Sequence, residues 1–483
     1  MFSIASTRPG LICGMIGALL LAGRASAAEA VDQAGADRIR QAIESYVGAK
    51  PFEDGFFSVV PDGDAYVVKA SLAKIVAKLR GASVDAPPFV YRLQPMPDGR
   101  YGLTSNNSYH LDFSADLPSG PFTQRFELTD CKSDGIFDPA MHAFSSYSVK
   151  CGLYHVTGKS RQQDVDLSFK DIAVDVKAKS AGAGRLDIAV TEALGSAVED
   201  ARFSDAHFSG RMKLSIGAGS ATISLNAVRY DALLDLVALI VRHDGPDSLK
   251  ADRDAIEAAA LKALPLHDGM DLQGNFKDAT VETPVGTFGL GSFGEHVTLT
   301  GLTKQASASI GFVYDGLRLP PSLPDLAKKF IPTHGQLEFA VKDIDADGLS
   351  RLAIQKFDPS QEPRIPAEAG PDFLKILTAG APHFLINPSS LVADDIDLKF
   401  EGDMSMLPTQ SGKFTLSAGG YDALRPALSK SGLPGADKAA LGVAFVRGLA
   451  KTGADGRLIW EIDFDTAKRS LTVNGTPLPV GPH

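Results

Sequence analysis

Residues 458–464 read Leu-Ile-Trp-Glu-Ile-Asp-Phe, with a large apolar residue at every second position. Successive side chains of a β-strand point to opposite faces, so this spacing predicts a strand with one apolar face. The same alternation recurs at residues 186–190, 212–216, 223–225, 297–299, 337–341 and 396–400. Such strands suit an antiparallel sheet that is covered on one side.

A strand–helix–loop–helix–strand order recurs along the chain. In the first copy, strand 222–228 precedes a helix that opens with Tyr-Asp-Ala-Leu at 230–233, and helix 252–264 and strand 271–278 follow. The second copy has strand 413–417, the same four residues at 421–424, helix 437–450 and strand 457–465. A weaker third copy has strand 337–343, helices 347–355 and 371–377, and strand 396–400.

Repeated units of this kind usually stack, because each buries an apolar face against its neighbour. We therefore expect a β-dominated α+β fold, in which a long curved antiparallel sheet carries short helices packed on it. A chance match of four residues is the alternative to duplication.

Helices are also expected near the start of the chain. Residues 32–47 place Ile39, Ile43 and Val47 at helical spacing, and residues 71–79 form a second helix that ends before Gly81. The expected organisation is a signal peptide at 1–27, an α+β region at 28–164, and β-rich regions at 165–300 and 301–483.

The first 27 residues resemble a cleavable secretory signal peptide. Arg8 precedes an apolar run at 11–22, and Ala25-Ser26-Ala27 is the small-residue motif that signal peptidase cuts. The run is shorter than the roughly 20 residues that a membrane-spanning helix needs, so we expect cleavage after Ala27 and a periplasmic protein. A retained N-terminal anchor is the second interpretation.

The composition excludes some classes of partner. The chain carries 48 basic and 58 acidic residues, for a net charge of −10, and the predicted signal peptide contains two arginines and no acid. A protein that binds nucleic acid normally has the opposite sign, so no nucleic-acid partner is expected. With 44% hydrophobic residues the chain can form a large core.

Cys131 and Cys151 are the two cysteines that remain after removal of Cys13 with the signal peptide. An even pair in an oxidising compartment predicts a disulfide, and two separate buried thiols are the alternative.

Two short motifs are weak candidates for ligand sites. Residues 289–294 match the G-x-G-x-x-G pattern, but a strand follows where nucleotide binding requires a helix, so a glycine-rich turn or bulge is expected and no cofactor. Asp343, Asp345 and Asp347 have the spacing of the first half of a calcium loop. Ile354 stands where the bidentate glutamate should be, which leaves a weak metal site or a strand end with a helix cap at Asp347.

Three other motifs resemble those of the penicillin-recognising serine enzymes. They are Ser71-x-x-Lys74, Ser105-Asn106-Asn107 and Lys451-Thr452-Gly453. The last closes a predicted helix, whereas in that family it lies on a strand, so a serine hydrolase is only a remote alternative. The histidines show no zinc-ligand spacing, and Trp460 is expected to be a core residue.

A family resemblance lies in residues 373–386, the strand at 396–402 and the ending Leu471-Thr472-Val473-Asn474-Gly475-Thr476-Pro477-Leu478. Over residues 165–480 these features resemble the YdgA-like envelope proteins and, more distantly, the AsmA-like proteins. The resemblance implies a long curved sheet with a groove and no catalytic residues that could be carried over.

The leading hypothesis is a non-enzymatic periplasmic protein that holds a lipid or another hydrophobic partner on an apolar sheet face. The residues expected to line this face are Leu337, Phe339, Val341, Ile396, Leu398 and Phe400. The second hypothesis is an adaptor whose groove is filled by its own helices and whose outer face binds envelope proteins.

Overall fold

The computed structural model describes residues 30–71, 82–117, 120–161, 163–204, 209–243, 246–358, 364–430 and 435–479. The predicted signal peptide and most of the helix predicted at 71–79 lie outside these residues. The described chain is β-dominated, with 54% strand and 24% helix, as the alternation predicts. It divides into two compact units, residues 1–269 with 357–365, and residues 270–356 with 366–483.

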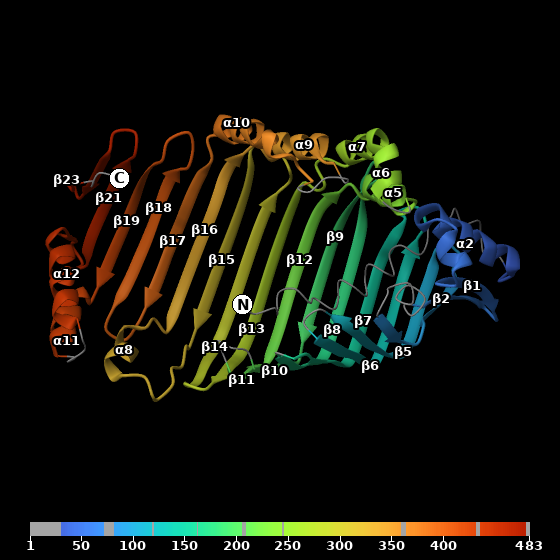
Figure 1. The fold of residues 1–483 in the computed structure, drawn as a ribbon, viewed down its shortest axis with the longest axis horizontal. Coiled ribbons are helices and arrows are strands. Elements are labelled where there is room, and N and C mark those ends of the chain that lie inside the picture. Colours follow the sequence, from blue (N-terminus) through green and yellow to red (C-terminus); the bar gives the residue numbers. More distant parts are fainter. Residues whose placement is uncertain are drawn as a thin grey trace. The chain divides into compact units, whose positions relative to one another are not determined.

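The first unit is an antiparallel sheet with helices at its edges (Figure 1). Its described strands are β1 (Phe57–Asp62), β2 (Ala65–Ala70), β3 (Ala82–Asp85), β4 (Phe89–Pro95), β5 (Tyr101–Leu117), β6 (Gly120–Asp138), β7 (Ala143–Lys159), β8 (Gln163–Gly182), β9 (Arg185–Leu194), β10 (Ser196–Ser204), β11 (Ser209–Ile216) and β12 (Ala218–Val228). Its described helices are α2 (Gln33–Val47), α3 (Lys50–Glu53), α5 (Tyr230–Val241), α6 (Pro246–Ala251) and α7 (Arg253–Lys262).

The strands of this unit pair in the order β1, β2, β4, β5, β6, β7, β8. β3 pairs with the C-terminal part of β5. The long strand β8 then pairs with β10 along its first half and with β9 along its second half. β10 pairs in turn with β11, and β9 pairs in turn with β12. Beyond β8 the sheet therefore continues as two separate sets of strands.

The long strands β6 and β8 keep their apolar residues on one face despite a change of phase near the middle of each strand. In β8, Val165, Leu167 and Phe169 occupy odd positions, whereas Ile172 and Val174 occupy even positions. Asp171 lies between the two groups with a left-handed φ of 52°. Asp130 has the same conformation in β6, with φ of 54°. A residue inserted in this way is a β-bulge, which changes the phase of the alternation without turning the strand over.

The core of the first unit forms where α2 packs against the first strands. Asp32 caps α2, because its Oδ1 accepts a hydrogen bond from the Gly35 amide at 2.7 Å, and Ile39 and Ile43 are buried as predicted. They join a cluster that includes Phe137 and Leu93. Nearby, Cys131 of β6 and Cys151 of β7 form the predicted disulfide, with Cα atoms 4.1 Å apart.

The second unit is also antiparallel. Its described strands are β13 (Gly269–Thr283), β14 (Gly286–Thr300), β15 (Ala306–Asp315), β16 (His334–Ile344), β17 (His383–Val392), β18 (Asp397–Ser405), β19 (Ser411–Gly419), β20 (Lys451–Thr452), β21 (Leu458–Asp465), β22 (Ser470–Val473) and β23 (Thr476–Pro477). Its described helices are α8 (Asp325–Phe330), α9 (Ala346–Lys356), η2 (Ala367–Ala369), α10 (Gly370–Gly380), η3 (Tyr421–Ala423), α11 (Leu424–Lys430) and α12 (Ala436–Gly448).

From β14 the strands of the second unit pair in chain order through β19, and β19 then pairs with β21. The helices α9 and α10 connect the neighbouring strands β16 and β17, and α11 and α12 connect the neighbouring strands β19 and β21. In the first unit, the segment that follows α7 lies against β12, where the Asp268 amide donates a hydrogen bond to the Asn226 carbonyl at 2.9 Å.

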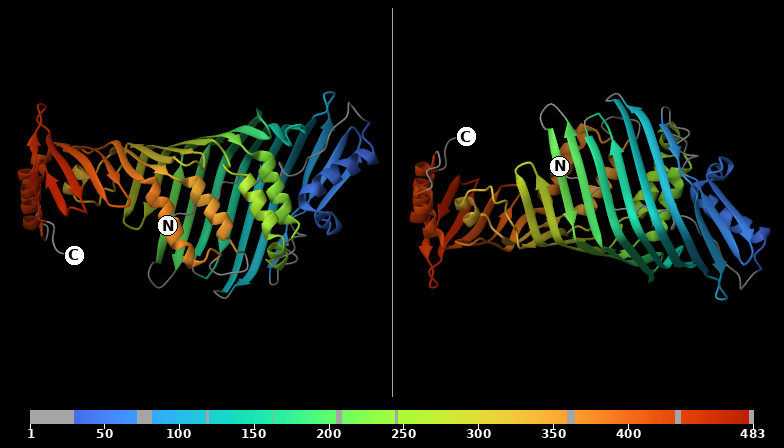
Figure 2. Two further views of the ribbon diagram at one scale, coloured as in Figure 1. Left: turned by 90° about the horizontal axis from the view of Figure 1, so that it is seen from above. Right: turned by 90° about the horizontal axis from the view of Figure 1, so that it is seen from below.

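One predicted strand assignment is wrong. Residues 396–400 do not close the segment that contains α9 and α10, because β17 intervenes and is the strand that pairs with β16. The predicted position of the helices on the sheet also needs correction. α5–α7 and α9–α10 lie along the ends of the strands of their own units (Figure 2).

Candidate functional site

The predicted binding residues of β16 lie on one face of the second unit's sheet. They occupy alternate positions of the strand: Leu337, Phe339 and Val341. Phe339 is paired with Ile310 of β15 and with Ile386 of β17. Directly paired residues of antiparallel strands have side chains on the same face. The face therefore continues across at least three strands.

Two of the three residues predicted near β18 join this face. Phe384 of β17 is paired with Met404, which lies an even number of residues from Phe400 and Leu398 on β18. These three residues of β18 therefore share the face of Phe384, whose ring stacks on Phe339 at a centroid distance of 6.2 Å. Ile396 is not part of the strand, because β18 begins at Asp397; it is buried in the preceding turn.

The apolar face extends beyond the predicted residues. Phe400 is paired with Leu416 of β19, and Leu416 with Trp460 of β21. Further aromatic pairs lie along the sheet, with Phe414 stacked on Phe464 at 6.0 Å. The result is one face with apolar side chains on each of β15, β16, β17, β18, β19 and β21. Its two rows are offset at β17, where Ile386 is paired with Gly402 and Ser389 with Phe400.

This face is only partly covered by the rest of its unit. Leu337, Phe339 and Phe400 are half-buried, and Ile310 is 37% exposed. α9 and α10 lie at the strand ends, as Figure 2 shows, so these two helices leave the row of rings accessible from the sheet face.

The face ends at a covered core beside α12. Trp460 is 3% exposed, as expected for a core residue, and its indole Nε1 donates a hydrogen bond to the Val446 carbonyl of α12 at 2.8 Å. The Tyr421 ring meets the Trp460 ring edge-on at 5.2 Å. Leu449 also packs against this cluster. The helical connection thus closes one end of the apolar row.

The first unit has an apolar face of its own, which the sequence prediction did not include. Tyr154 of β7 is paired with Phe169 of β8, and Val156 with Leu167, and the two rings are stacked at 5.8 Å. Tyr154 and Val156 are 7% and 6% exposed. The alternation of β8, which carries Leu167 and Phe169, was missed because the bulge at Asp171 interrupts it.

A cavity of about 230 Å³ opens on this face. Most of its lining is apolar and includes Phe126, Val156 and Leu167, and one wall carries the carboxyl group of Glu199. The Oε2 atom of Glu199 is buried and has no hydrogen-bond partner. Burial raises the pKa of this carboxyl group above its usual value. In the sequence, the one sign of this site is an acidic residue at an apolar position of an alternating pattern, at Ala197-x-Glu199-x-Ala201. That sign alone does not identify a site.

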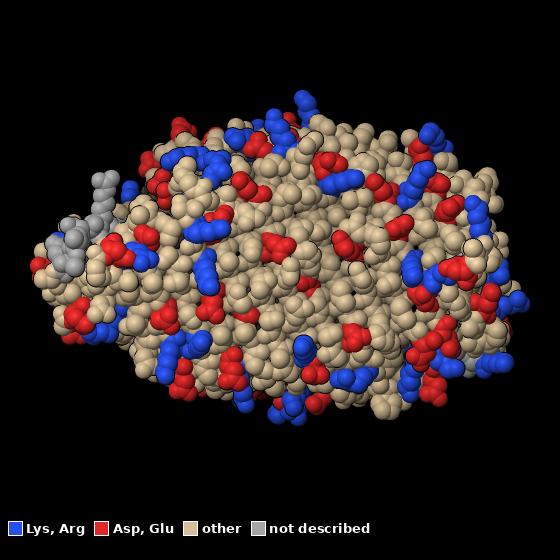
Figure 3. All heavy atoms as spheres, turned by 180° about the vertical axis from the view of Figure 1, so that it is seen from behind, with Lys and Arg blue, Asp and Glu red and all other residues tan. Residues whose placement is uncertain are grey.

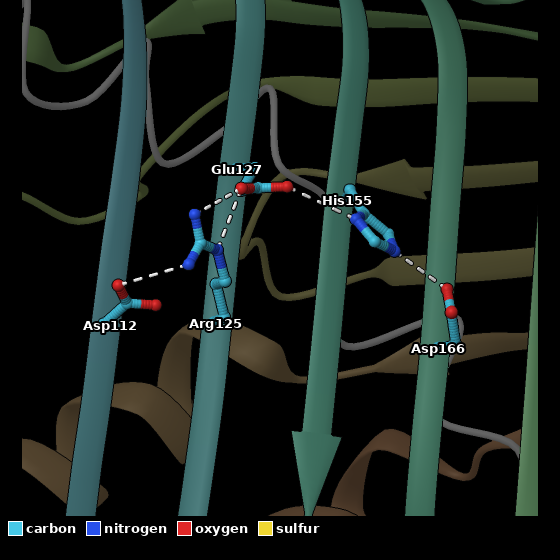
Figure 4. Close-up of polar contacts among 5 residues, drawn as sticks. All are labelled: Asp112, Arg125, Glu127, His155 and Asp166. Atoms are coloured by element: carbon cyan, nitrogen blue, oxygen red, sulfur yellow. Dashed lines mark hydrogen bonds and ion pairs between the residues drawn. The ribbon is translucent and has the colours of Figure 1, made fainter.

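The opposite face of the same strands is charged (Figure 4). Asp112, Arg125, Glu127, His155 and Asp166 form a row of ion pairs across β5, β6, β7 and β8. The Glu127 carboxylate lies 2.7 Å from Arg125 and 3.4 Å from His155. The Arg125 hydrogen bond, followed by that of His155, lowers the pKa of Glu127. Solvent-exposed pairs of this kind stabilise little, and their geometry suits a hydrated outer surface.

Charged residues of both signs are interspersed on the surface drawn in Figure 3. Neither sign forms a broad patch among the residues coloured there. This distribution does not resemble the basic surfaces that bind polyanions.

The acidic motif at residues 343–347 belongs to the start of a helix. Asp345, and not the predicted Asp347, caps this helix, because its Oδ1 accepts a hydrogen bond from the Gly348 amide at 2.9 Å. Asp347 lies in the first turn of the helix and pairs with Arg351 at 2.8 Å. With Asp343 these two aspartates form no convergent set of metal ligands in the described part of the chain. Such a set does occur at Asp85, His110 and Asp112, but Asp112 also lies 3.6 Å from Arg125.

The remaining motifs lie on strands. The glycine-rich residues 289–294 lie within the strand β14, and not in the predicted turn or bulge. Ser105 lies on β5, and Lys74 lies outside the described residues. Lys451 and Thr452 form the short strand β20 rather than the end of a helix, and Lys451 pairs with Glu461 at 3.0 Å.

Among the described helices, none is both long and apolar enough to cross a membrane. Comparison of the chain with protein-family models, curated proteins and solved structures found no match.

Proposed function

We propose that this chain is an exported, non-enzymatic protein of the bacterial envelope that holds the acyl chains of a lipid against the apolar face of its sheet. The observation that carries the proposal is the shared apolar face of these strands. On it the register runs from Ile310 through Phe339, Ile386 and Gly402 to Phe414 and Ile462, and Phe400, Leu416 and Trp460 form a second row beside it. Their side chains are half-buried along most of the row, so they offer apolar area that a ligand can remove from water.

The dimensions of the row suit an acyl chain. Six neighbouring strands at a spacing of about 4.8 Å extend over about 24 Å. A bilayer has a hydrocarbon core of about 30 Å, so one acyl chain extends over about 15 Å. Each methylene group removed from water contributes about 0.8 kcal/mol, which makes a fully covered chain a strong ligand.

The proposed location of the protein outside the cytoplasm rests on the sequence. The signal-peptide pattern that ends at Ala27 and the cysteine pair Cys131–Cys151 both favour an oxidising space outside the cytoplasm. The resemblance to YdgA-like and AsmA-like envelope proteins favours the same location. We include in the proposal that the three segments predicted as repeats arose by duplication.

Site-specific photo-crosslinking along β18 tests this function. A photoreactive amino acid is placed in turn at Leu398, Lys399, Phe400 and Glu401, and the protein is irradiated in cells before its lipids are analysed. Lipid adducts are expected at Leu398 and Phe400, which share the apolar face, and not at Lys399 and Glu401.

The alternation of the adducts is the decisive feature of this experiment. Absence of lipid adducts at all four positions contradicts the lipid-binding function. Protein adducts at Lys399 and Glu401 without lipid adducts elsewhere support instead an adaptor that binds envelope proteins through its outer face.

A further inference from the structure

Glu199 is the acidic residue in the apolar surroundings of the first unit's cavity. On β10 it is paired with Leu167 of β8 on one side and with Leu214 of β11 on the other. The residues two positions before and after it, Ala197 and Ala201, are 6% and 4% exposed. Because these two side chains are small, they leave space beside the carboxyl group.

One oxygen of the Glu199 carboxyl group has no hydrogen-bond partner among the described residues. This oxygen, Oε2, is buried. Leaving a buried acceptor unpaired is unfavourable, and removing a carboxylate from water without a counter-ion is more so. The cavity of about 230 Å³ has room for seven or eight groups of roughly the 30 Å³ that a water molecule occupies. That volume accommodates a small polar head with the first atoms of a chain.

We propose that this cavity binds the primary ammonium group of an amphiphile, with Glu199 as its counter-ion and hydrogen-bond acceptor. The inference extends the proposed lipid binding to the first unit, where the hydrocarbon chain of the amphiphile would lie on that unit's own apolar face. An ammonium group is compact and has three donors, so it satisfies the buried oxygen. An anionic head is repelled by Glu199, and a hydroxyl group gives a weaker bond because it carries no charge. Lys159 also lines the cavity, but its side chain is exposed.

The test compares three probes of equal chain length by titration calorimetry below their micelle concentrations: decylammonium, decyltrimethylammonium and decanol. The full-length mature protein is expected to bind decylammonium at least about tenfold more tightly than either of the others, because charge-assisted hydrogen bonds are the strong ones. The trimethylated head retains the charge but has no N–H donor. Glu199→Gln is expected to reduce the preference to about threefold or less, with the affinity for decanol unchanged.

Glu192→Gln is the matched control. Glu192 lies on the same face of the sheet, paired with Val174 of β8, but does not line the cavity. This variant should keep the preference of the wild type, and circular dichroism checks that both variants are folded. The inference is overturned if Glu199→Gln keeps the preference, or if Glu192→Gln loses it equally. Equal binding of all three probes, or no binding of any probe, also overturns this inference. The proposed function of the second unit's face fails separately, if no lipid adducts form at Leu398 and Phe400.

Discussion

The Cβ atom of Asp171 lies 2.9 Å from the position that a Cβ atom would occupy on Gly195, the residue between β9 and β10. Asp171 has a left-handed backbone and marks the point where the apolar alternation of β8 changes phase. A glycine at position 195 leaves the space that this conformation needs. Asp130 and Gly152 repeat the relationship one strand pair away, at the more relaxed distance of 3.5 Å.

Gly195→Ala should therefore destabilise the first unit. The added methyl group meets the Asp171 Cβ atom, and overpacking of this kind typically costs about 1–3 kcal/mol. Gly152→Ala is the control, and it should change the free energy of unfolding by less than about 1 kcal/mol because 3.5 Å is an ordinary contact. Urea unfolding measures both values. Equal effects of the two substitutions would argue against a specific role for the close contact at Gly195.

The disulfide should be present in the mature protein and should stabilise it. Cys131 and Cys151 are separated by 20 positions, a loop length for which the chain-entropy model gives about 3 kcal/mol. Replacing both residues with alanine should lower the free energy of unfolding by about this amount. Thiol labelling of denatured, unreduced protein checks the bond itself, and two labelled thiols would show that it does not form.

Glu199 should make stability depend on pH. Burial raises the pKa of its carboxyl group in the folded protein above the unfolded value, so the folded state binds the proton more tightly. Its contribution therefore becomes more favourable as pH falls through the raised pKa towards the ordinary value, and is lost as pH rises through the raised pKa. Lys159 is the other charged residue among the described residues that line the cavity.

Substitution of this residue isolates the effect. Glu199→Gln should raise the Tm at pH 7 and should have little effect on it at pH 4, where the glutamate is protonated. Differential scanning fluorimetry at the two pH values makes the comparison, with Glu192→Gln as the control. A lower Tm for Glu199→Gln at pH 7 would show that the carboxylate has a stabilising partner.

Sequence reasoning succeeded where the signal is local. The helix over residues 32–47, the alternation around Trp460 and the cysteine pair depend on short-range patterns, and the structure contains each of them. The long strands β6 and β8 were missed because bulges at Asp130 and Asp171 divide each strand into two short alternating parts of different phase.

The strand β17 was missed for a related reason. Its sequence contains Asn387-Pro388-Ser389-Ser390, which predicts a turn. The structure accommodates these residues in a bulge between Ile386 and Ser389, where Pro388 needs no place in the ladder of hydrogen bonds. Glu199 could not be recognised as a site from sequence, because the residues around it come from β8 and β11 as well as from its own strand.

The most direct test of the central claim is the lipid content of Phe339→Asp, compared with the wild type and with Ala340→Asp on the opposite face of β16. Each protein is purified from its own host, checked by circular dichroism, and examined by native mass spectrometry and lipid extraction. Because Phe339 is half-buried on an accessible face, its replacement should leave the fold intact and remove the lipid, whereas Ala340→Asp should retain the lipid. Unfolding of Phe339→Asp would place this residue in a closed core, because a buried unpaired carboxylate is not tolerated there. That result, or lipid-free wild-type protein, would contradict the account.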